Sequence, residues 1–352
     1  MEGRTLKILE AIVDEYILTG EPVGSKTIQE KLDISVSSAT IRNEMASLEQ
    51  QGFLEHPHTS SGRVPTFKGY RLYIEKFSTR NSLSDDEKLQ IDQMFDGITE
   101  STAEEIIGEA SKALAAITKC AIVSTNETSR FSVITKVEVI PTGRRMYVLL
   151  LITSGGNIKN RVCRLSFDLT HEQIAFFQRF ANENLAGLEL ENLTEKNIED
   201  MALALGSYMM TLSPLMKGVM ELSAEMLREK VNLEGEANLI TCDEFGSREI
   251  ASLLESRNQF TEILANAFSG INILFGQEND KFVVSNSSII TSSFSKGDKK
   301  AGSFGVIGPM RLDYKKIIPY IEYFTDKVTD LLSLQDEDEE LREIEKEADR
   351  ID

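Results

Sequence analysis

The sequence predicts an α+β protein of two or three domains whose first domain is a winged helix-turn-helix. Three observations support this prediction. The chain has 352 residues, which is more than a single compact core usually holds. The first 80 residues show three short helical patterns followed by a hairpin pattern. Beyond residue 120, runs of strand-forming residues alternate with longer helical stretches.

The amino-terminal region has the spacing of a helix-turn-helix. Apolar residues recur at helical intervals over residues 4–19, and Gly20 can end that helix in a left-handed conformation. Ser25 can cap a second helix over residues 26–32, because its hydroxyl can accept from a free N–H group of the first turn. Ser37 is placed to cap a third helix that runs to residue 51.

The third helix has a polar face suited to the major groove of DNA. Ile41, Met45 and Leu48 form its apolar stripe, so Arg42 and Asn43 project elsewhere. Arginine can pair with guanine and asparagine with adenine through two hydrogen bonds each. A polar-faced helix by itself is also common in three-helix bundles, so the assignment depends on the segment that follows.

That following segment predicts a wing. Residues 53–55 favour a strand, residues 56–61 a polar loop, and Gly62 is free to take a positive φ. Arg63 begins the returning strand, and we expect it at the hairpin tip, where it can enter a narrow minor groove. A fourth helix through Phe67 and Phe77 then packs back on the domain.

The charge of the chain is concentrated in its second part. The formal net charge is −19, yet residues 1–80 carry 10 Lys and Arg against 11 Asp and Glu, whereas residues 81–352 carry 28 against 46. Within residues 60–80, five basic residues face only Glu75. The amino-terminal region can therefore approach phosphates although the whole chain is acidic.

The rest of the chain predicts an antiparallel sheet, further strands and several helices. Helices are expected near residues 85–97, 102–118, 170–185, 196–229, 247–268 and 314–334, and strands near 121–125, 132–140, 146–153, 158–167, 271–275, 282–285, 288–294 and 302–307. Residues 335–352 form an acidic tail with 10 acidic and 3 basic residues. The methionine-rich helical stretch is either ordinary core or part of a dimer interface, and we favour an interface for Met201, Leu205, Tyr208, Met209 and Leu212.

Several classes of function are excluded by what the sequence lacks. Three histidines and no cluster of His, Cys and carboxylates leave no evident catalytic or metal site, so we expect no enzyme and no cofactor. Three cysteines without CxxC spacing favour reduced structural thiols. The longest apolar run, Met146 to Ile152, is far shorter than the ~20 residues of a membrane helix. No export signal is evident, and we expect a cytoplasmic, soluble protein without a membrane partner.

Three segments of the chain are SSATIRNEMASLE (37–49), HTSSGRVPTFKGYR (58–71) and FGVIGPMRLDY (304–314). With these segments the chain resembles the heat-inducible transcription repressor family HrcA. The resemblance implies a homodimer that binds an inverted-repeat operator in double-stranded DNA upstream of chaperone operons and represses them. It also implies that chaperonin maintains the active fold. The family fold is a winged helix-turn-helix followed by a GAF-like α/β domain that is interrupted by an inserted, largely helical dimerisation domain.

The resemblance also assigns residues and boundaries. The expected DNA contacts of the recognition helix are Ser37, Ser38, Thr40, Arg42 and Asn43. Those of the wing are Ser61, Gly62 and Arg63. Three flanking residues are expected to contact the DNA backbone: Ser25, Lys26 and Tyr70. The expected DNA-binding domain is residues 1–80. The two parts of the GAF-like domain are residues 81–187 and 271–334, the insertion between them is residues 188–270, and the acidic tail is residues 335–352. A regulator that senses a small molecule through the GAF-like domain remains the alternative, and it keeps the DNA-binding region.

Overall fold

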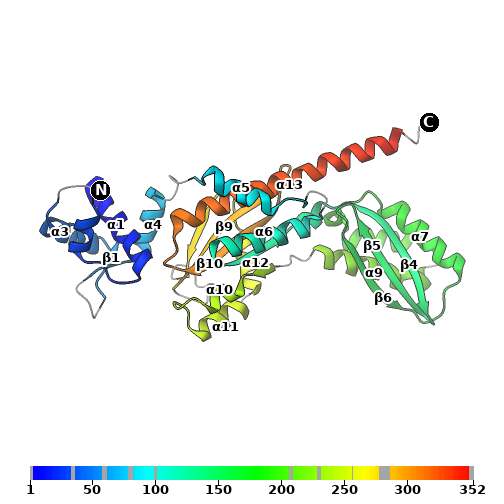
Figure 1. The fold of residues 1–352 in the computed structure, drawn as a ribbon. Coiled ribbons are helices and arrows are strands. Elements are labelled where there is room, and N and C mark those ends of the chain that lie inside the picture. Colours follow the sequence, from blue (N-terminus) through cyan, green and yellow to red (C-terminus); the bar gives the residue numbers. More distant parts are fainter. Residues whose placement is uncertain are drawn as a thin grey trace.

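The computed structural model describes residues 3–32, 36–57, 62–77, 82–98, 101–204, 206, 209–227, 231–255, 257–276 and 286–348. These residues form three lobes arranged in a row: an N-terminal lobe at one end, a central lobe, and a distal lobe at the other end (Figure 1). The chain is a mixed α+β protein, as predicted. No helix in the described ranges combines the length and the apolar character needed to span a membrane.

The N-terminal lobe consists of short helices and a two-stranded sheet. Its elements are α1 (Gly3–Thr19), α2 (Ser25–Lys31), α3 (Ser38–Gln50), β1 (Leu54–Glu55), β2 (Val64–Pro65) and α4 (Phe67–Phe77). The apolar stripes of α1 and α3 face each other and include Ile12, Ile41 and Leu48, each 0% exposed. Gly20 has φ +70 directly after α1, the left-handed conformation that glycine adopts without a Cβ clash.

The central lobe is a three-layer arrangement around an antiparallel sheet of order β7-β3-β10-β9-β8. Its strands are β7 (Val231–Glu234), β3 (Ala121–Asn126), β10 (Lys299–Pro309), β9 (Ser287–Lys296) and β8 (Asn272–Phe275), and its helices are α5 (Asp85–Met94), α6 (Ala103–Thr118), α10 (Glu236–Ile240), α11 (Ser247–Glu255), α12 (Arg257–Ala265) and α13 (Tyr314–Ala348). Successive residues of β3 enter different cores: Ile122 packs with α6 and α13, while Val123 packs with α10 to α12. Both faces of this sheet are therefore covered.

The distal lobe is a second sheet with helices on one face. The sheet has the order β4-β5-β6, and its strands are β4 (Ile134–Gly143), β5 (Met146–Thr153) and β6 (Ile158–Arg164). The helices are α7 (His171–Leu185), α8 (Glu195–Ala204) and α9 (Met209–Leu227), and the short 3₁₀ turns Thr128–Phe131 and Leu190–Asn192 lie near the junction with the central lobe. Inward residues of β5, such as Leu149 and Leu151, are 0% exposed beneath these helices.

The lobes of the structure have other boundaries than the predicted domains. The expected insertion was residues 188–270, with β4 to β6 in the GAF-like part. Among the described strands, β4, β5 and β6 pair only with one another, and their core is shared with α7 to α9. Residues 231–265 instead return to the central sheet through β7, which pairs with β3. The distal lobe is thus the segment between β3 and β7. Local sequence patterns did not predict this, because β3 and β7 pair across more than 100 residues.

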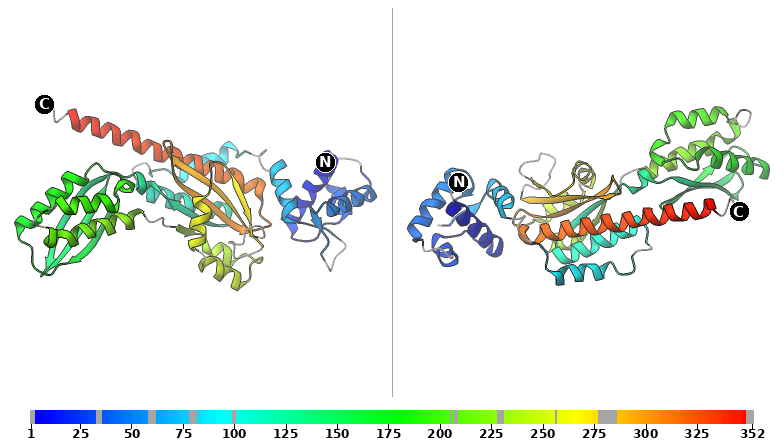
Figure 2. Two further views of the ribbon diagram at one scale, coloured as in Figure 1. Left: turned by 180° about the vertical axis from the view of Figure 1, so that it is seen from behind. Right: turned by 90° about the horizontal axis from the view of Figure 1, so that it is seen from above.

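Element boundaries also differ in detail. The expected helix over residues 247–268 is two helices, α11 and α12. The strand expected to end near residue 140 continues to Gly143 as β4. The helix expected to end at residue 334 continues to Ala348, so most of the acidic tail is helical. Helix α13 starts beside the N-terminal lobe and runs along the central lobe toward the distal end (Figures 1 and 2). The strand expected at residues 282–285 lies outside the described residues.

Candidate nucleic-acid interface

Helix α3 begins with a capped amino terminus. The Ser37 hydroxyl accepts from the Thr40 backbone N–H at 3.2 Å and lies 2.9 Å from the Thr40 hydroxyl. The Ser25 and Ser38 hydroxyls also lie 2.9 Å apart. This contact joins the start of α2 to the start of α3, so the amino-terminal ends of both helices lie side by side. The free N–H groups at helix amino termini favour negatively charged groups, including phosphates.

The polar face predicted for α3 is present. Ile41, Met45 and Leu48 are buried, while Arg42 and Asn43 are exposed. Thr40 is half-buried because it takes part in the cap. Among the described residues, neither Arg42 nor Asn43 is held by an ion pair or a side-chain hydrogen bond. Their side chains are therefore available to a partner, and their contact with DNA stays a prediction.

Two contacts with α1 restrict the orientation of α3. The Glu44 carboxylate accepts from Arg4 Nη2 at 2.6 Å and from the Thr5 hydroxyl at 2.8 Å. The hydrogen bond from Arg4, followed by that from Thr5, lowers the pKa of Glu44. Glu44 lies one position beyond Asn43 on α3. The contacts thus connect α3 to α1 directly beside Asn43 and restrict how α3 can turn relative to α1.

The structure corrects two predictions for the wing. Arg63 is not at the hairpin tip: its backbone pairs with Val23 through hydrogen bonds of 2.9 and 3.0 Å, and its Nε donates to Glu49 at 2.8 Å. The guanidinium is half-buried at the base of the hairpin, which leaves it badly placed to enter a minor groove. Gly62 does not use a positive φ. A Cβ there would lie 2.5 Å from the Pro22 carbonyl oxygen, so glycine is required by close packing. Ser61 lies outside the described residues.

Tyr70 is also placed differently from our prediction. Its side chain is 0% exposed and its ring packs against Tyr314 of α13, with ring centroids 6.0 Å apart. The buried side chain cannot reach a DNA backbone, so the predicted contact is wrong. Of the other flanking positions, Lys26 is exposed and Ser25 is half-buried. Both lie in the first turn of α2, beside the start of α3.

Much of the basic surplus of residues 60–80 is used within the lobe. Arg63 pairs with Glu49, and the Lys68 ammonium donates to the Gln51 carbonyl at 2.9 Å. The ammonium of Lys76 lies 2.7 Å from Glu75. A charge count along the sequence misses these pairings because Glu49 and Gln51 come from the third helix and its end. Of the cations on α2 and α3, Lys31 pairs with Glu15, whereas Lys26 and Arg42 are exposed.

The N-terminal lobe is attached to the central lobe by α13 and the loop before it. The Lys315 ammonium lies 2.9 Å from Glu10 and 2.9 Å from Asp14, both on α1. The Arg311 guanidinium donates to the Ile17 carbonyl at 2.7 Å and to Glu244 at 2.7 Å. This contact between the lobes was not predicted from the sequence. Its only signal was the conspicuous segment FGVIGPMRLDY, which contains Arg311 and ends one residue before Lys315.

The predicted dimer segment is partly core. Leu212 is 0% exposed within the distal lobe, and Met201 is half-buried against the same cluster. The interface role predicted for Leu212 is therefore wrong, and this residue belongs to the core of the distal lobe, which was the alternative. Leu205 and Tyr208 lie outside the described residues, and the side chain of Met209 is not described.

The three cysteines are free thiols, and Cys120 and Cys163 are buried. Burial raises the pKa of Cys120 to about 12, which keeps that thiol protonated and poorly nucleophilic. In the described ranges, no group of three or more His, Cys, Asp or Glu side chains is arranged to hold a metal ion.

Comparisons with known proteins agree with this architecture. The family model for the C-terminal domain of the HrcA protein matches residues 104–318. The heat-inducible transcription repressor HrcA of Acetivibrio thermocellus is 33% identical over 335 residues, which cover 93% of this chain and 95% of that protein. The protein of the same name from Ruminiclostridium cellulolyticum is 32% identical, with coverage of 96% and 99%. A crystal structure of a hypothetical protein has a TM-score of 0.68 at 24% identity, covers 95% of this chain and 99% of that chain, and supports the fold alone.

The fold and these relatives define the class of protein as a regulator of transcription. The relatives are repressors, and their similarity extends over nearly the whole chain. The chain belongs to the HrcA family of heat-inducible transcription repressors.

Proposed function

We propose that the chain is a dimeric repressor of chaperone operons that binds an inverted-repeat operator through α3. One observation carries this proposal: Arg42 and Asn43 are exposed on a helix whose amino terminus is capped by Ser37 and which the contact between Glu44 and Arg4 connects to α1. A polar recognition helix anchored on its own domain is what base reading in the major groove requires. In this proposal the N-terminal lobe is a winged helix-turn-helix and the central lobe is GAF-like.

Residues near the recognition helix have distinct roles in this proposal. Arg42 and Asn43 contact base edges, whereas Lys26 and the first turns of α2 and α3 hold phosphates. Ser25, Ser37, Ser38 and Thr40 contribute hydroxyls and N–H groups to these phosphate contacts.

The outer face of the distal sheet is the surface we propose for the dimer. Ile140, Val148 and Val162 lie side by side across β4, β5 and β6. Ile140 is 43% and Val162 57% exposed, and Ile158 on the same face is 59% exposed. The helices α7 to α9 cover the opposite face. A second copy of the chain offers the same apolar face, so two copies can bury both faces about a twofold axis.

An operator-binding experiment tests the proposal. Fluorescence anisotropy would measure binding to a labelled inverted repeat from a chaperone promoter and to a random duplex of equal length. Asn43→Ala should cost about 1–3 kcal/mol of discrimination at one base position if it pairs with adenine. Arg42→Ala should weaken operator binding, whereas Arg144→Ala, in the distal lobe, should not. Equal affinity of the unmodified protein for both duplexes would reject the proposal.

The dimer is tested separately by sedimentation equilibrium. Val162→Glu places a charge in the apolar face and should shift the protein to monomers. Leu89→Glu is the matched control, because Leu89 on α5 is also 57% exposed but lies in the central lobe. Dimers that persist in Val162→Glu would exclude this face.

The family resemblance further supports a role for chaperonin. We propose that chaperonin raises the fraction of active repressor after thermal stress. The test is operator binding after heating and cooling, with chaperonin and ATP or with bovine serum albumin. Equal recovery in both samples would reject this part of the proposal.

A further inference from the structure

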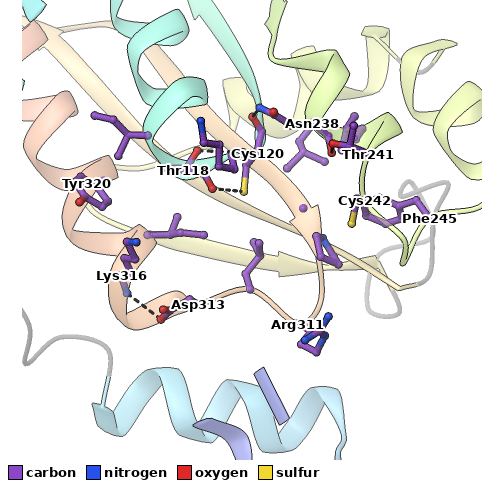
Figure 3. A pocket seen from close by; sticks show the side chains of 18 residues that line it. Thr118, Cys120, Asn238, Thr241, Cys242, Phe245, Arg311, Asp313, Lys316 and Tyr320 are labelled. Carbon is purple, nitrogen blue, oxygen red and sulfur yellow. Dashed lines mark hydrogen bonds between the residues drawn. The ribbon is translucent and has the colours of Figure 1, made fainter. Parts of the chain in front are cut away.

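A pocket of about 500 Å³ lies where the central sheet, α10 and the start of α13 meet (Figure 3). Its walls come from the carboxyl end of α6, from α10 and the turn after it, from the end of β10, and from the first turns of α13. Pockets for small molecules typically enclose ~300–1,000 Å³. The size of the pocket therefore suits a molecule of metabolite size.

The inner wall of the pocket is apolar. Leu239, Phe245, Ile307, Leu312 and Ile317 line it, and each of these side chains is buried. They come from both sides of the β10–α13 connection and from the α10 region. A hydrocarbon chain or an aromatic ring placed against them would be removed from water over most of its surface, which favours binding.

The exposed part of the lining is rich in cations. Lys119 and Lys316 line the pocket, both are exposed, and neither forms an ion pair with a carboxylate in the described part of the chain. Asp313 is the acidic lining residue, and its carboxylate accepts from the backbone N–H of Lys316 at 3.2 Å. The Glu87 carboxylate lies beside this part of the lining, because it accepts from the hydroxyl of the lining residue Tyr320 at 2.8 Å and interacts with the charge of Lys316. Lys119, Arg311 and Lys316 still outnumber Asp313 in the lining. They favour a ligand that carries negative charge.

Lys119 has a further feature that the fold alone does not require. It caps the end of α6 with φ 57, a left-handed conformation in which glycine is usual. A lysine in this conformation accepts some backbone strain, and this lysine lines the pocket.

We propose that this pocket binds a small organic anion with an apolar body, such as an aromatic or medium-chain carboxylate. The apolar part packs on Leu239, Phe245 and Ile307, and the carboxylate accepts hydrogen bonds from the Lys119 and Lys316 ammonium groups. This inference goes beyond operator binding and does not depend on it, because the ligand is tested on the protein without DNA.

The location of the pocket connects it to the rest of the molecule. Arg311 lines the pocket (Figure 3). The same guanidinium donates to the Ile17 carbonyl on α1 and to Glu244. A bound anion would therefore lie beside a residue that joins the central lobe to the N-terminal lobe.

Isothermal titration calorimetry with benzoate and with hexanoate tests the proposal on the full chain. We expect at least one of them to bind with a Kd of about 1 mM or tighter. The uncharged amides, benzamide and hexanamide, keep the apolar body without the charge and should bind at least about tenfold more weakly.

Variants locate the site. Lys119→Ala combined with Lys316→Ala should weaken carboxylate binding at least about tenfold. Thr241→Trp fills the pocket without changing its charge and should also abolish binding. Lys112→Ala is the matched control, because Lys112 lies on the same helix that Lys119 caps but pairs with Glu109 outside the pocket, and it should leave binding unchanged.

Three results would overturn the proposal. The first is that neither carboxylate binds at about 10 mM, well above the expected Kd. The second is that carboxylates and amides bind equally. The third is that binding survives in the Thr241→Trp variant and in the double lysine variant, provided that their circular dichroism matches that of the unmodified protein.

Discussion

Removing the hydroxyl of one tyrosine on α4 should stabilise the N-terminal lobe, and removing that of another should destabilise it. Tyr70 and Tyr73 are both 0% exposed. The Tyr70 hydroxyl has no hydrogen-bond partner among the described residues, whereas the Tyr73 hydroxyl donates to Asp14. Burial raises the pKa of both phenols, so both are neutral at all ordinary pH values. The comparison therefore isolates the hydrogen bond.

The expected magnitudes follow from these surroundings. A buried hydroxyl without a partner costs about 1–3 kcal/mol. Tyr70→Phe removes this cost and keeps the ring beside Tyr314, so we expect the N-terminal lobe to become more stable by about 1–2 kcal/mol. Tyr73→Phe removes a hydrogen bond to a carboxylate and should destabilise the lobe by about 1.5–3 kcal/mol.

Native-state hydrogen exchange measures these changes where they occur. A change of ~1.4 kcal/mol alters the opening equilibrium tenfold, so slow amides of α1 and α4 should exchange more slowly in Tyr70→Phe and faster in Tyr73→Phe. Amides of α9, in the distal lobe, serve as the internal reference. If Tyr70→Phe accelerated exchange in α4, the hydroxyl would be making a stabilising bond and the reasoning would be refuted.

Three further changes probe the N-terminal lobe. Gly62→Ala should destabilise it by about 1–3 kcal/mol in urea unfolding, because the new Cβ meets a carbonyl oxygen at 2.5 Å, whereas Gly143→Ala has open space and should be neutral. Glu44→Gln should flatten the acid dependence of hydrogen exchange in α3. Hydrogen bonding from Arg4 lowers the pKa of Glu44, so the stabilisation by this carboxylate is present above its ordinary value of 4.5 and is lost as the pH falls through the lower folded value. The same acid dependence in the variant and the unmodified protein would show that the Glu44 hydrogen bonds contribute nothing. Lys26→Ala should reduce the salt dependence of operator binding by about one unit of slope on operator and random DNA alike; an unchanged slope would remove Lys26 from the phosphate contacts.

In the N-terminal lobe, the features that were predicted correctly depend on interactions between residues close together in the sequence. Helices α1 to α3, the Ser37 cap and the exposed face of α3 depend on residues within a few positions of one another, and local patterns identified them. The places of Arg63 and Tyr70 depend on Glu49 and on Tyr314, which are distant in sequence. Local reasoning therefore predicted the exposed face of α3 correctly and misplaced the partners of the wing and of α4.

The same distinction explains why the lobes have other boundaries than the predicted domains. Strand β7 has only four residues, Val-Asn-Leu-Glu, and although they alternate between apolar and polar, so short a run does not reveal the pairing with β3. The methionine-rich stretch of α9 was interpreted as a partner surface, although residues such as Leu212 fill the core of their own lobe. The exposed face proposed for the dimer instead consists of alternate residues of three strands, each of which looks unremarkable in sequence.

The pairing of β3 with β7 has a consequence for how the molecule can be taken apart. Thr125 lies opposite Val231 at the point where the chain leaves the central sheet and returns to it. A short β-turn between these two residues would close the gap without moving either strand. The segment between these two residues should therefore be removable by gene deletion, and it should also be expressible alone. In evolution, related proteins could gain, lose or exchange this segment while the central sheet is kept.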